Sequence, residues 1–250
     1  MKTLLTLATV ALLAASASWL TAANADTRCY EMRVYYAAPG RLGDLEARFR
    51  DHTCALFAKH GFTNIGYWAP LENPDHKLLY IIASPNREAH SKAWTEFGKD
   101  PAWQEVVKAT ESKSRLVTKV ESYFLKTTDF SPLVKPSSAD APRVFELRTY
   151  TAAPGKLDAL QARFRDHTLA LFAKHGMTSV GYWVALESKP ENTLIYMLAH
   201  KSREAGAESF ANFRKDPDWI AAKSASETNG PLTTKVESLF MAPEDFSPIK

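Results

Sequence analysis

The chain lacks most of the short motifs by which enzymes and cofactor-binding proteins are recognised. Its 250 residues contain no GxGxxG, no P-loop, no HExxH, no CxxC and no GxSxG. The histidines are dispersed and show no spacing typical of metal ligands. The sequence therefore gives no support for dinucleotide binding, P-loop phosphate binding, zinc-protease chemistry, thioredoxin-type redox chemistry or a serine-hydrolase elbow.

The chain also lacks a strong excess of either charge. Lysine and arginine number 31 against 28 aspartates and glutamates, which gives a formal net charge of +3. The charges are interspersed, and no polybasic block or basic amphipathic helix stands out. This balance is not typical of a surface that binds nucleic acid or adheres to a membrane, so neither partner is expected.

Long apolar runs are absent after the first 25 residues. Residues 4–20 are largely apolar, follow Lys2 and precede Ala23-Asn24-Ala25, a small-x-small cleavage site. The pattern predicts a signal peptide over residues 1–25, cut after Ala25, and hence a periplasmic or secreted protein. An uncleaved anchor is the alternative, but Thr and Ser interrupt the stretch, which falls short of a comfortable span of roughly 20 residues.

Cysteine is scarce, and only Cys29 and Cys54 are present. Export would permit a disulfide between them. A later, similar part of the chain has Val144 and Leu169 at the corresponding positions, which favours two buried free thiols. The disulfide is the alternative. A reactive thiol has less support, because no cation is arranged to lower a thiol pKa.

The sequence is dominated by a duplication. Residues 30–71 align with residues 145–186 at an offset of 115, with 28 identities in 42 positions. After one inserted residue near Lys189 the match resumes at an offset of 116, where DPAW at Asp100 corresponds to DPDW at Asp216. A repeat this regular predicts two similar structural units. They are assigned as residues 26–130 and 143–250, joined by a linker over residues 131–142.

Each repeat is predicted to run strand, helix, strand, strand, helix, strand. Alternation over residues 30–36 indicates the first strand, and an apolar helical stripe follows up to Gly61. The order βαββαβ is that of the ferredoxin-like unit, whose sheet carries helices on one face only. A second copy in the same chain can cover the bare face. We therefore expect an α+β fold in which two tandem ferredoxin-like repeats form a single-chain pseudo-dimeric α/β barrel. Further association into a homo-oligomer stays open.

Several motifs, each present twice and in the same order, resemble the NIPSNAP family. They are YEMRVY and FELRTY on the first strands, the APG turn, KHG followed by GYW, and DPAW and DPDW late in each repeat. The resemblance covers essentially the whole chain after residue 25. It implies a dimeric α/β barrel, in agreement with the strand order, but it brings no agreed activity.

The first strand of each repeat carries a repeated charged pattern. Glu31, Arg33 and Tyr35 share one face, while Tyr30 and Met32 lie on the other, because strand side chains alternate. We expect the apolar set to pack under the helices and the charged set to face the barrel interior. Such a set is either an ion-pair network between the sheets or the floor of a ligand pocket. The second repeat offers the same charged set as Glu146, Arg148 and Tyr150.

Duplicated histidines and aromatics are further candidates. His52 and His167 lie seven residues after a helical leucine, which predicts the apolar side of the helix. They are expected to be half-buried and hydrogen-bonded, with a catalytic acid or base as the alternative. The aromatic candidates favour core packing, with the lining of a pocket for a flat ligand as the alternative. They are Trp68, Tyr80, Trp183 and Tyr196.

Three functions remain open on the sequence. The first is an exported protein that binds a small apolar or aromatic molecule between the two facing sheets. The second is a cofactor-free oxygenase or isomerase, with Glu31 or Glu146 as base and Arg33 or Arg148 stabilising an oxyanion. The third is a structural scaffold. No cofactor or metal is predicted, although haem stays open because related barrels bind it. The expected ligand-binding residues are Glu31, Arg33, Tyr35, Trp68, Tyr80, Glu146, Arg148, Tyr150, Trp183 and Tyr196, and the catalytic candidates are Glu31, Glu146, His52 and His167.

Overall fold

The computed structural model describes residues 26–138, 141–186 and 192–250. The predicted signal peptide, residues 1–25, lies outside the described residues. Within the described part of the chain, no helix has the length and apolar character needed to cross a membrane.

The first repeat has the predicted βαββαβ order, with each helical layer divided into shorter pieces. Its first half contains β1 (Cys29–Ala37), α1 (Leu42–Arg48), a π-helical turn η1 (Phe49–Thr53), α2 (Cys54–Lys59) and β2 (Thr63–Pro70). Its second half contains β3 (Lys77–Ser84), α3 (Arg87–Lys99), α4 (Pro101–Thr110) and β4 (Val117–Thr127).

The second repeat has the same elements in the same order. It begins with β5 (Val144–Ala152), α5 (Leu157–Arg163), η2 (Phe164–Thr168), α6 (Leu169–Lys174) and β6 (Thr178–Ala185). It ends with β7 (Thr193–His200), α7 (Arg203–Lys215), α8 (Pro217–Ser226) and β8 (Thr233–Pro243).

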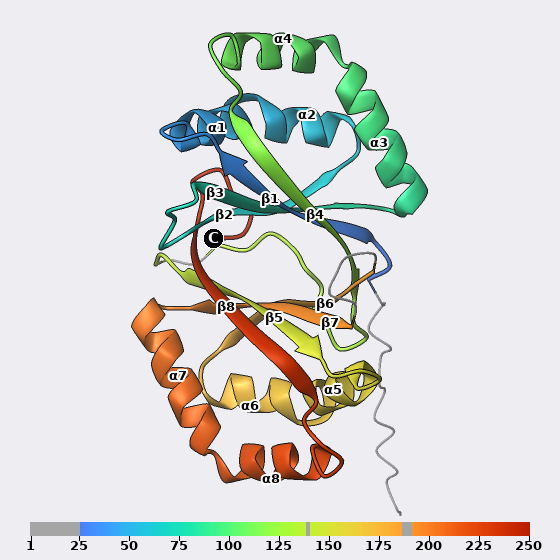
Figure 1. The fold of residues 1–250 in the computed structure, drawn as a ribbon, viewed down its shortest axis with the longest axis vertical. Coiled ribbons are helices and arrows are strands. Elements are labelled where there is room, and N and C mark those ends of the chain that lie inside the picture. Colours follow the sequence, from blue (N-terminus) through green and yellow to red (C-terminus); the bar gives the residue numbers. More distant parts are fainter. Residues whose placement is uncertain (1–25, 139–140, 187–191) are drawn as a thin grey trace, which may run out of the picture.

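The eight strands close into one antiparallel barrel in the order β1-β3-β2-β8-β5-β7-β6-β4. Each repeat supplies a four-stranded sheet, and the sheets join where β2 pairs with β8 and β4 pairs with β6. Figure 1 shows the helices of the first repeat above this barrel and those of the second repeat below it. The predicted pseudo-dimeric α/β barrel is thereby confirmed.

Short polar signals set the helix starts. The Asn86 side chain accepts a hydrogen bond of 2.8 Å from the Ala89 N–H at the start of α3. Asp100 accepts one of 2.9 Å from the Ala102 N–H, and Pro101 follows it as the first residue of α4. Both are N-cap arrangements, in which a side-chain oxygen satisfies an N–H that has no partner within the helix.

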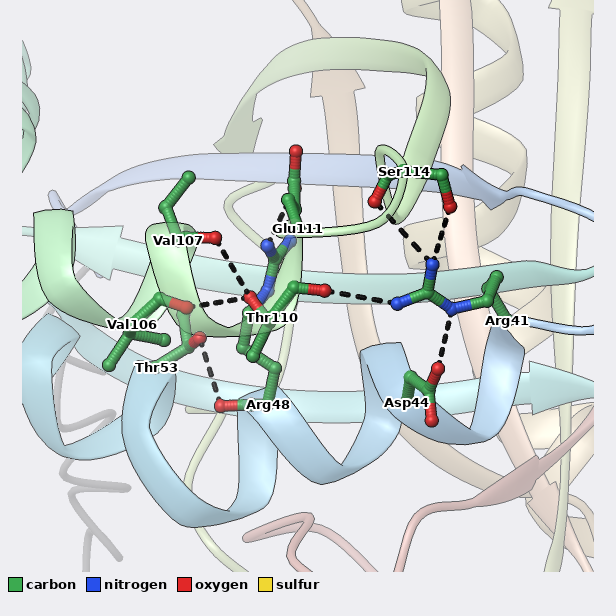
Figure 2. A network of polar contacts seen from close by, with 9 residues as sticks. All are labelled: Arg41, Asp44, Arg48, Thr53, Val106, Val107, Thr110, Glu111 and Ser114. Carbon is green, nitrogen blue, oxygen red and sulfur yellow. Dashed lines mark hydrogen bonds and ion pairs between the residues drawn. The ribbon is translucent and has the colours of Figure 1, made fainter.

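The identical segment FRDHT forms a π-helical turn in both repeats. In the first repeat the Cys54 N–H bonds to Phe49 O, five residues earlier. The Thr53 hydroxyl donates to Arg48 O at 3.1 Å, and Thr168 donates to Arg163 O at the same distance. Figure 2 shows this threonine bond in the first repeat. Such turns shift the residues that follow around the helix axis, and they are frequent at functional sites.

Three apolar clusters make up the core. One fills the barrel interior between the two sheets, and it includes Tyr30, Met32, Trp68, Phe145 and Trp183. The other two lie between each sheet and its own helices. Each sheet therefore buries apolar side chains on both faces, which distinguishes it from the one-sided sheet of an isolated ferredoxin-like unit.

The end of each repeat crosses onto the other repeat. After β8, the Glu244 N–H bonds to Tyr67 O, and Ser247 Oγ accepts from the Tyr67 N–H at 2.9 Å. After β4, the Thr128 N–H and Ser131 make the same two contacts with Tyr182. Phe246 packs on the helix-side core of the first repeat, and Phe130 packs on that of the second. We call residues 128–134 and 244–250 the exchanged arms. Neither repeat completes its core alone.

Candidate functional site

The charged face of the first strand points toward the helices, so its predicted direction was wrong. Glu31 lies against His90 and Trp94 of α3, and Arg33 lies 4.4 Å from the Trp94 ring centroid. Tyr30 and Met32 fill the barrel interior instead. The second repeat has the same orientation. The reason is electrostatic: the barrel interior is packed with apolar side chains, while the helix side offers hydrogen-bond donors for a buried carboxylate.

The predicted ligand residues are divided between the two faces of the sheets. Trp68 and Trp183 are fully buried in the barrel interior. Tyr80 and Tyr196 are fully buried on the helix side. The charged residues join these two tyrosines on the helix side, so eight of the ten predicted residues gather in two equivalent clusters. They are Glu31, Arg33, Tyr35 and Tyr80, and Glu146, Arg148, Tyr150 and Tyr196.

Glu31 is surrounded by hydrogen-bond donors. Its Oε2 lies 2.8 Å from His90 Nε2 and accepts from Trp94 Nε1 at 2.7 Å. Its Oε1 accepts from the Ser122 hydroxyl at 2.5 Å, while the Arg33 guanidinium stays 3.7 Å away. Burial alone would raise the pKa of Glu31, but these bonds and the arginine charge outweigh it and hold the pKa below its usual value.

Glu146 is also surrounded by hydrogen-bond donors, but some of them come from other sequence positions than those around Glu31. His200 Nε2 lies 3.1 Å from its Oε2, and its Oε1 accepts from Ser238 and from Arg148 Nη1, each at 2.5 Å. Burial again opposes ionisation, and again the hydrogen bonds and the arginine lower the pKa of Glu146. A carboxylate held ionised in this way is a weak base, so the contacts favour a positioning role for both glutamates.

The two histidines that contact the glutamates occupy equivalent places in their repeats, although they stand at different positions of the aligned sequences. His90 lies on α3, whereas His200 ends β7. At the offset of 116, His90 corresponds to Gly206, and His200 corresponds to Ser84. The absence of a histidine at the matching position of the other repeat weakens both as ligands in a comparison of the aligned repeats. One sequence signal could have revealed them. The first repeat has Ser84 and His90 where the second has His200 and Gly206, so the histidine changes between two positions that are six residues apart.

A cavity of about 790 Å³ lies between the sheet and the helices of the second repeat. Arg148 and Tyr150 of β5 line it from the sheet side, and Arg163 and Thr168 line it from the helix side. Burial opposes the charge of Arg148, but the nearby tyrosine oxygens and the Glu146 carboxylate raise its pKa above the ordinary value. Arg148 therefore stays charged, and the lining is cationic, since Arg148, Arg163, Arg214 and Lys223 stand against Glu227 alone. Its walls are aromatic and include Phe164, Phe172, Phe210, Phe213 and Trp219.

The arginine just before each π-helical turn contacts the end of the late helix of its repeat. Arg163 Nη1 donates to Glu227 at 2.8 Å, and its counterpart Arg48 makes the same bond with Glu111, as Figure 2 shows. Beside Arg48 a groove of about 640 Å³ runs between α1 and α4. Its lining is polar, contains no aromatic residue and does not include Arg33.

A smaller cavity of about 350 Å³ opens into the barrel between the two sheets, where the sequence predicted a ligand pocket. None of the ten predicted ligand residues lines it. Its apolar side chains come from both repeats and include Met32, Val34, Leu79, Leu147, Ile195 and Leu239.

His52 and His167 are exposed, which corrects their predicted place on the apolar side of the helix. Both lie in the π-helical turns, and the wider turn moves them off the stripe that the seven-residue spacing implied. His52 lines the polar groove beside Arg48. Neither histidine lines the cationic cavity.

Cys29 and Cys54 are both half-buried in the structure, and Cys54 is a free thiol. Burial raises the pKa of Cys54 to about 11, so this thiol is a poor nucleophile near neutral pH. Among the described residues, no group of three or more His, Cys, Asp and Glu side chains is placed to hold a metal ion.

Replacement of Glu31 by Gln should destabilise the protein most near neutral pH. The lowered native pKa means that Glu31 contributes its full stability above the ordinary pKa of 4.5 and loses it as the pH falls through the native value. The melting temperatures of the wild type and E31Q should therefore differ most at pH 7 and converge toward pH 3. The exposed Glu237→Gln serves as the control. A constant difference across this range would contradict the assignment.

Comparison with known proteins adds a family and a fold. The NIPSNAP family model matches residues 30–132 and again residues 145–248. No curated protein matches the chain significantly. The two repeats of this chain thus carry the same family signature.

Solved structures resemble the chain both as a whole and in part. A putative monooxygenase from Lactobacillus acidophilus is 11% identical with a TM-score of 0.58, and the match covers 87% of this chain and 94% of that one. An anthrone oxidase-like protein is 12% identical with a TM-score of 0.57, over 87% and 92% of the two chains.

A NIPSNAP family protein of unknown function from Agrobacterium tumefaciens is 25% identical with a TM-score of 0.40, over 45% of this chain and 97% of that one. The family signature, found twice, covers most of the chain, and the fold is that of the dimeric α/β barrels. The protein belongs to the NIPSNAP family.

Proposed function

We propose that the protein binds a small aromatic molecule carrying a carboxylate or phenolate in the cationic cavity of the second repeat. The observation that carries this proposal is Arg148, a charged side chain with only 14% of its surface exposed, set in a cavity with aromatic walls. The volume of about 790 Å³ lies within the range of small-molecule sites. An anionic group beside the arginine and a flat ring against the aromatic walls would match this lining.

The contacts of Arg148 support its role as an anchor. Glu146 accepts from Nη1 at 2.5 Å, and Nη2 donates to the Tyr150 hydroxyl at a longer 3.3 Å. The guanidinium carbon lies 4.2 Å from the Phe210 ring centroid. These contacts fix the plane of the guanidinium before a ligand arrives, so little conformational freedom is lost on binding.

Replacement of Arg148 by Gln should weaken the binding of an aromatic carboxylate. A hydrogen bond to a charged group contributes about 1.5–3 kcal/mol, so the Kd should rise roughly 10- to 100-fold. The probe is 1-hydroxy-2-naphthoate, followed by its fluorescence. The neutral 1-hydroxy-2-naphthamide should bind both proteins alike, and circular dichroism checks the fold of the variant. Equal naphthoate affinity in the two proteins would contradict the proposal.

A second candidate is oxidation of an acidic aromatic compound by dioxygen. It is favoured by the shared fold with a putative monooxygenase and an anthrone oxidase-like protein, each matched over 87% of the chain. Arg148 would stabilise the enolate formed when an anthrone methylene loses a proton. Overall, the methylene carbon would lose two hydrogens and gain one oxygen atom of O₂, while the other oxygen atom leaves as water.

Oxygen consumption with anthrone as the probe tests this candidate. The wild type should exceed the rate of spontaneous oxidation in buffer, and R148Q should lose most of that excess. A wild-type rate equal to that of buffer, measured on protein that binds the naphthoate probe, would leave ligand binding as the function.

We also propose that the protein is exported and cleaved after Ala25. In support, Asp26 is already part of the fold: the Thr127 hydroxyl donates to its carbonyl oxygen at 2.5 Å, and Arg28 pairs with its carboxylate at 2.7 Å. Protein recovered from the exported fraction should have an intact mass that begins at Asp26. Full-length protein in that fraction would favour an uncleaved anchor.

A further inference from the structure

We infer that each chain binds one ligand, in the second repeat, and that this binding requires Phe210, which stands where the first repeat has Trp94. The inference rests on the proposed binding function. It concerns the two equivalent clusters, which share the glutamate, the arginine, two tyrosines and a serine but differ at this helix position.

The buried glutamate has a different third donor in each repeat. In the first repeat the Trp94 indole N–H donates to Glu31 Oε2 at 2.7 Å, and Arg33 stays 3.7 Å from Oε1. In the second repeat Phe210 has no donor, and Arg148 donates at 2.5 Å to Glu146 Oε1, the oxygen that also accepts from Ser238. The direct arginine bond is therefore present in the repeat that lacks the indole donor.

The other donors do not account for the difference. Serine contributes equally, since Ser122 and Ser238 both lie 2.5 Å from their carboxylate. An imidazole reaches the glutamate in both repeats, from α3 through His90 or from β7 through His200. The two histidine positions crowd one another: a Cβ at Gly206 would lie 3.0 Å from the His200 ring.

The consequence is a difference in how the two arginines are held. Arg148 is fixed by a charge-assisted bond and lines the cavity of the second repeat. Arg33 is held by weaker contacts, at 3.7 Å from Glu31 and over the Trp94 ring at 4.4 Å. A guanidinium with a fixed plane recognises a carboxylate better than a mobile one, because less freedom is lost on binding.

The side chains around the arginine also differ in size between the two repeats. Phe210 belongs to the cavity wall and is smaller than the indole of Trp94. Ser224 and Pro231 also line this cavity, where the first repeat has the longer Lys108 and Arg115. At two other lining positions the second repeat has the larger residue, Arg214 and Lys223 against Gly98 and Val107. The second repeat thus combines a fixed cation with a smaller side chain directly beside it, and we assign the ligand site to it.

Calorimetric titration with 1-hydroxy-2-naphthoate tests the inference. We expect one site per wild-type chain. F210W should raise the Kd at least tenfold, because the indole narrows the cavity and draws Glu146 away from Arg148. The matched variant W94F should keep the wild-type affinity. Two sites in the wild type, wild-type affinity in F210W, or equal losses in F210W and W94F would overturn the inference.

A second matched pair keeps the test decisive if F210W does not fold. R148Q should lose binding, whereas R33Q should retain one full-affinity site, and equal losses in the two variants would overturn the inference. Failure of the wild type to bind the probe at all would remove the proposed function, and this inference with it. Binding at two sites would remove this inference alone.

Discussion

Each repeat builds a four-stranded sheet with helices on one face only, and the other face is apolar and has to be covered. In this chain the second repeat covers it, and the two sheets enclose a core that includes Tyr30, Met32, Trp68 and Trp183. The seams between the sheets are short, with three residue pairs between β2 and β8 and three between β4 and β6. Buried apolar area and the exchanged arms therefore carry much of the contact between the repeats. Because this interior is apolar, the charged residues of β1 and β5 lie on the helix side of their sheets. The candidate site is found there.

The features that depend on repetition and periodicity could be predicted from the sequence. The duplication, the strand order, the caps at Asn86 and Asp100 and the pseudo-dimeric barrel all follow from spacing and composition. The direction of the first strand could not, because both of its faces are buried. Alternation shows that Glu31 and Arg33 share a face, but not which face. The choice depends on the donors that the other elements bring, here Trp94 and the two histidines, and these lie far away in sequence.

The remaining misses have two local causes. The π-helical turns widen the first helix of each repeat, so the seven-residue spacing that placed His52 on the apolar side does not apply across Phe49–Thr53. In the second repeat Phe164 and Thr168 of the turn lie on the cavity wall instead. The second cause is that equivalent groups need not share a sequence position. An imidazole can reach the equivalent carboxylate from a helix in one repeat and from a strand end in the other. A comparison of aligned residues does not detect that equivalence.

The exchanged arms have a consequence for the order in which the molecule can be made. Tyr67 of the first repeat bonds to Ser247, 180 residues later in the chain. A chain emerging from the ribosome cannot complete its first repeat until β8 and the second exchanged arm have been synthesised. Until then β2 has an unpaired edge, of the kind that invites association with other chains. Closing so long a loop also slows folding. The two repeats of this design therefore reach their native state together, and the first cannot fold to completion ahead of the second.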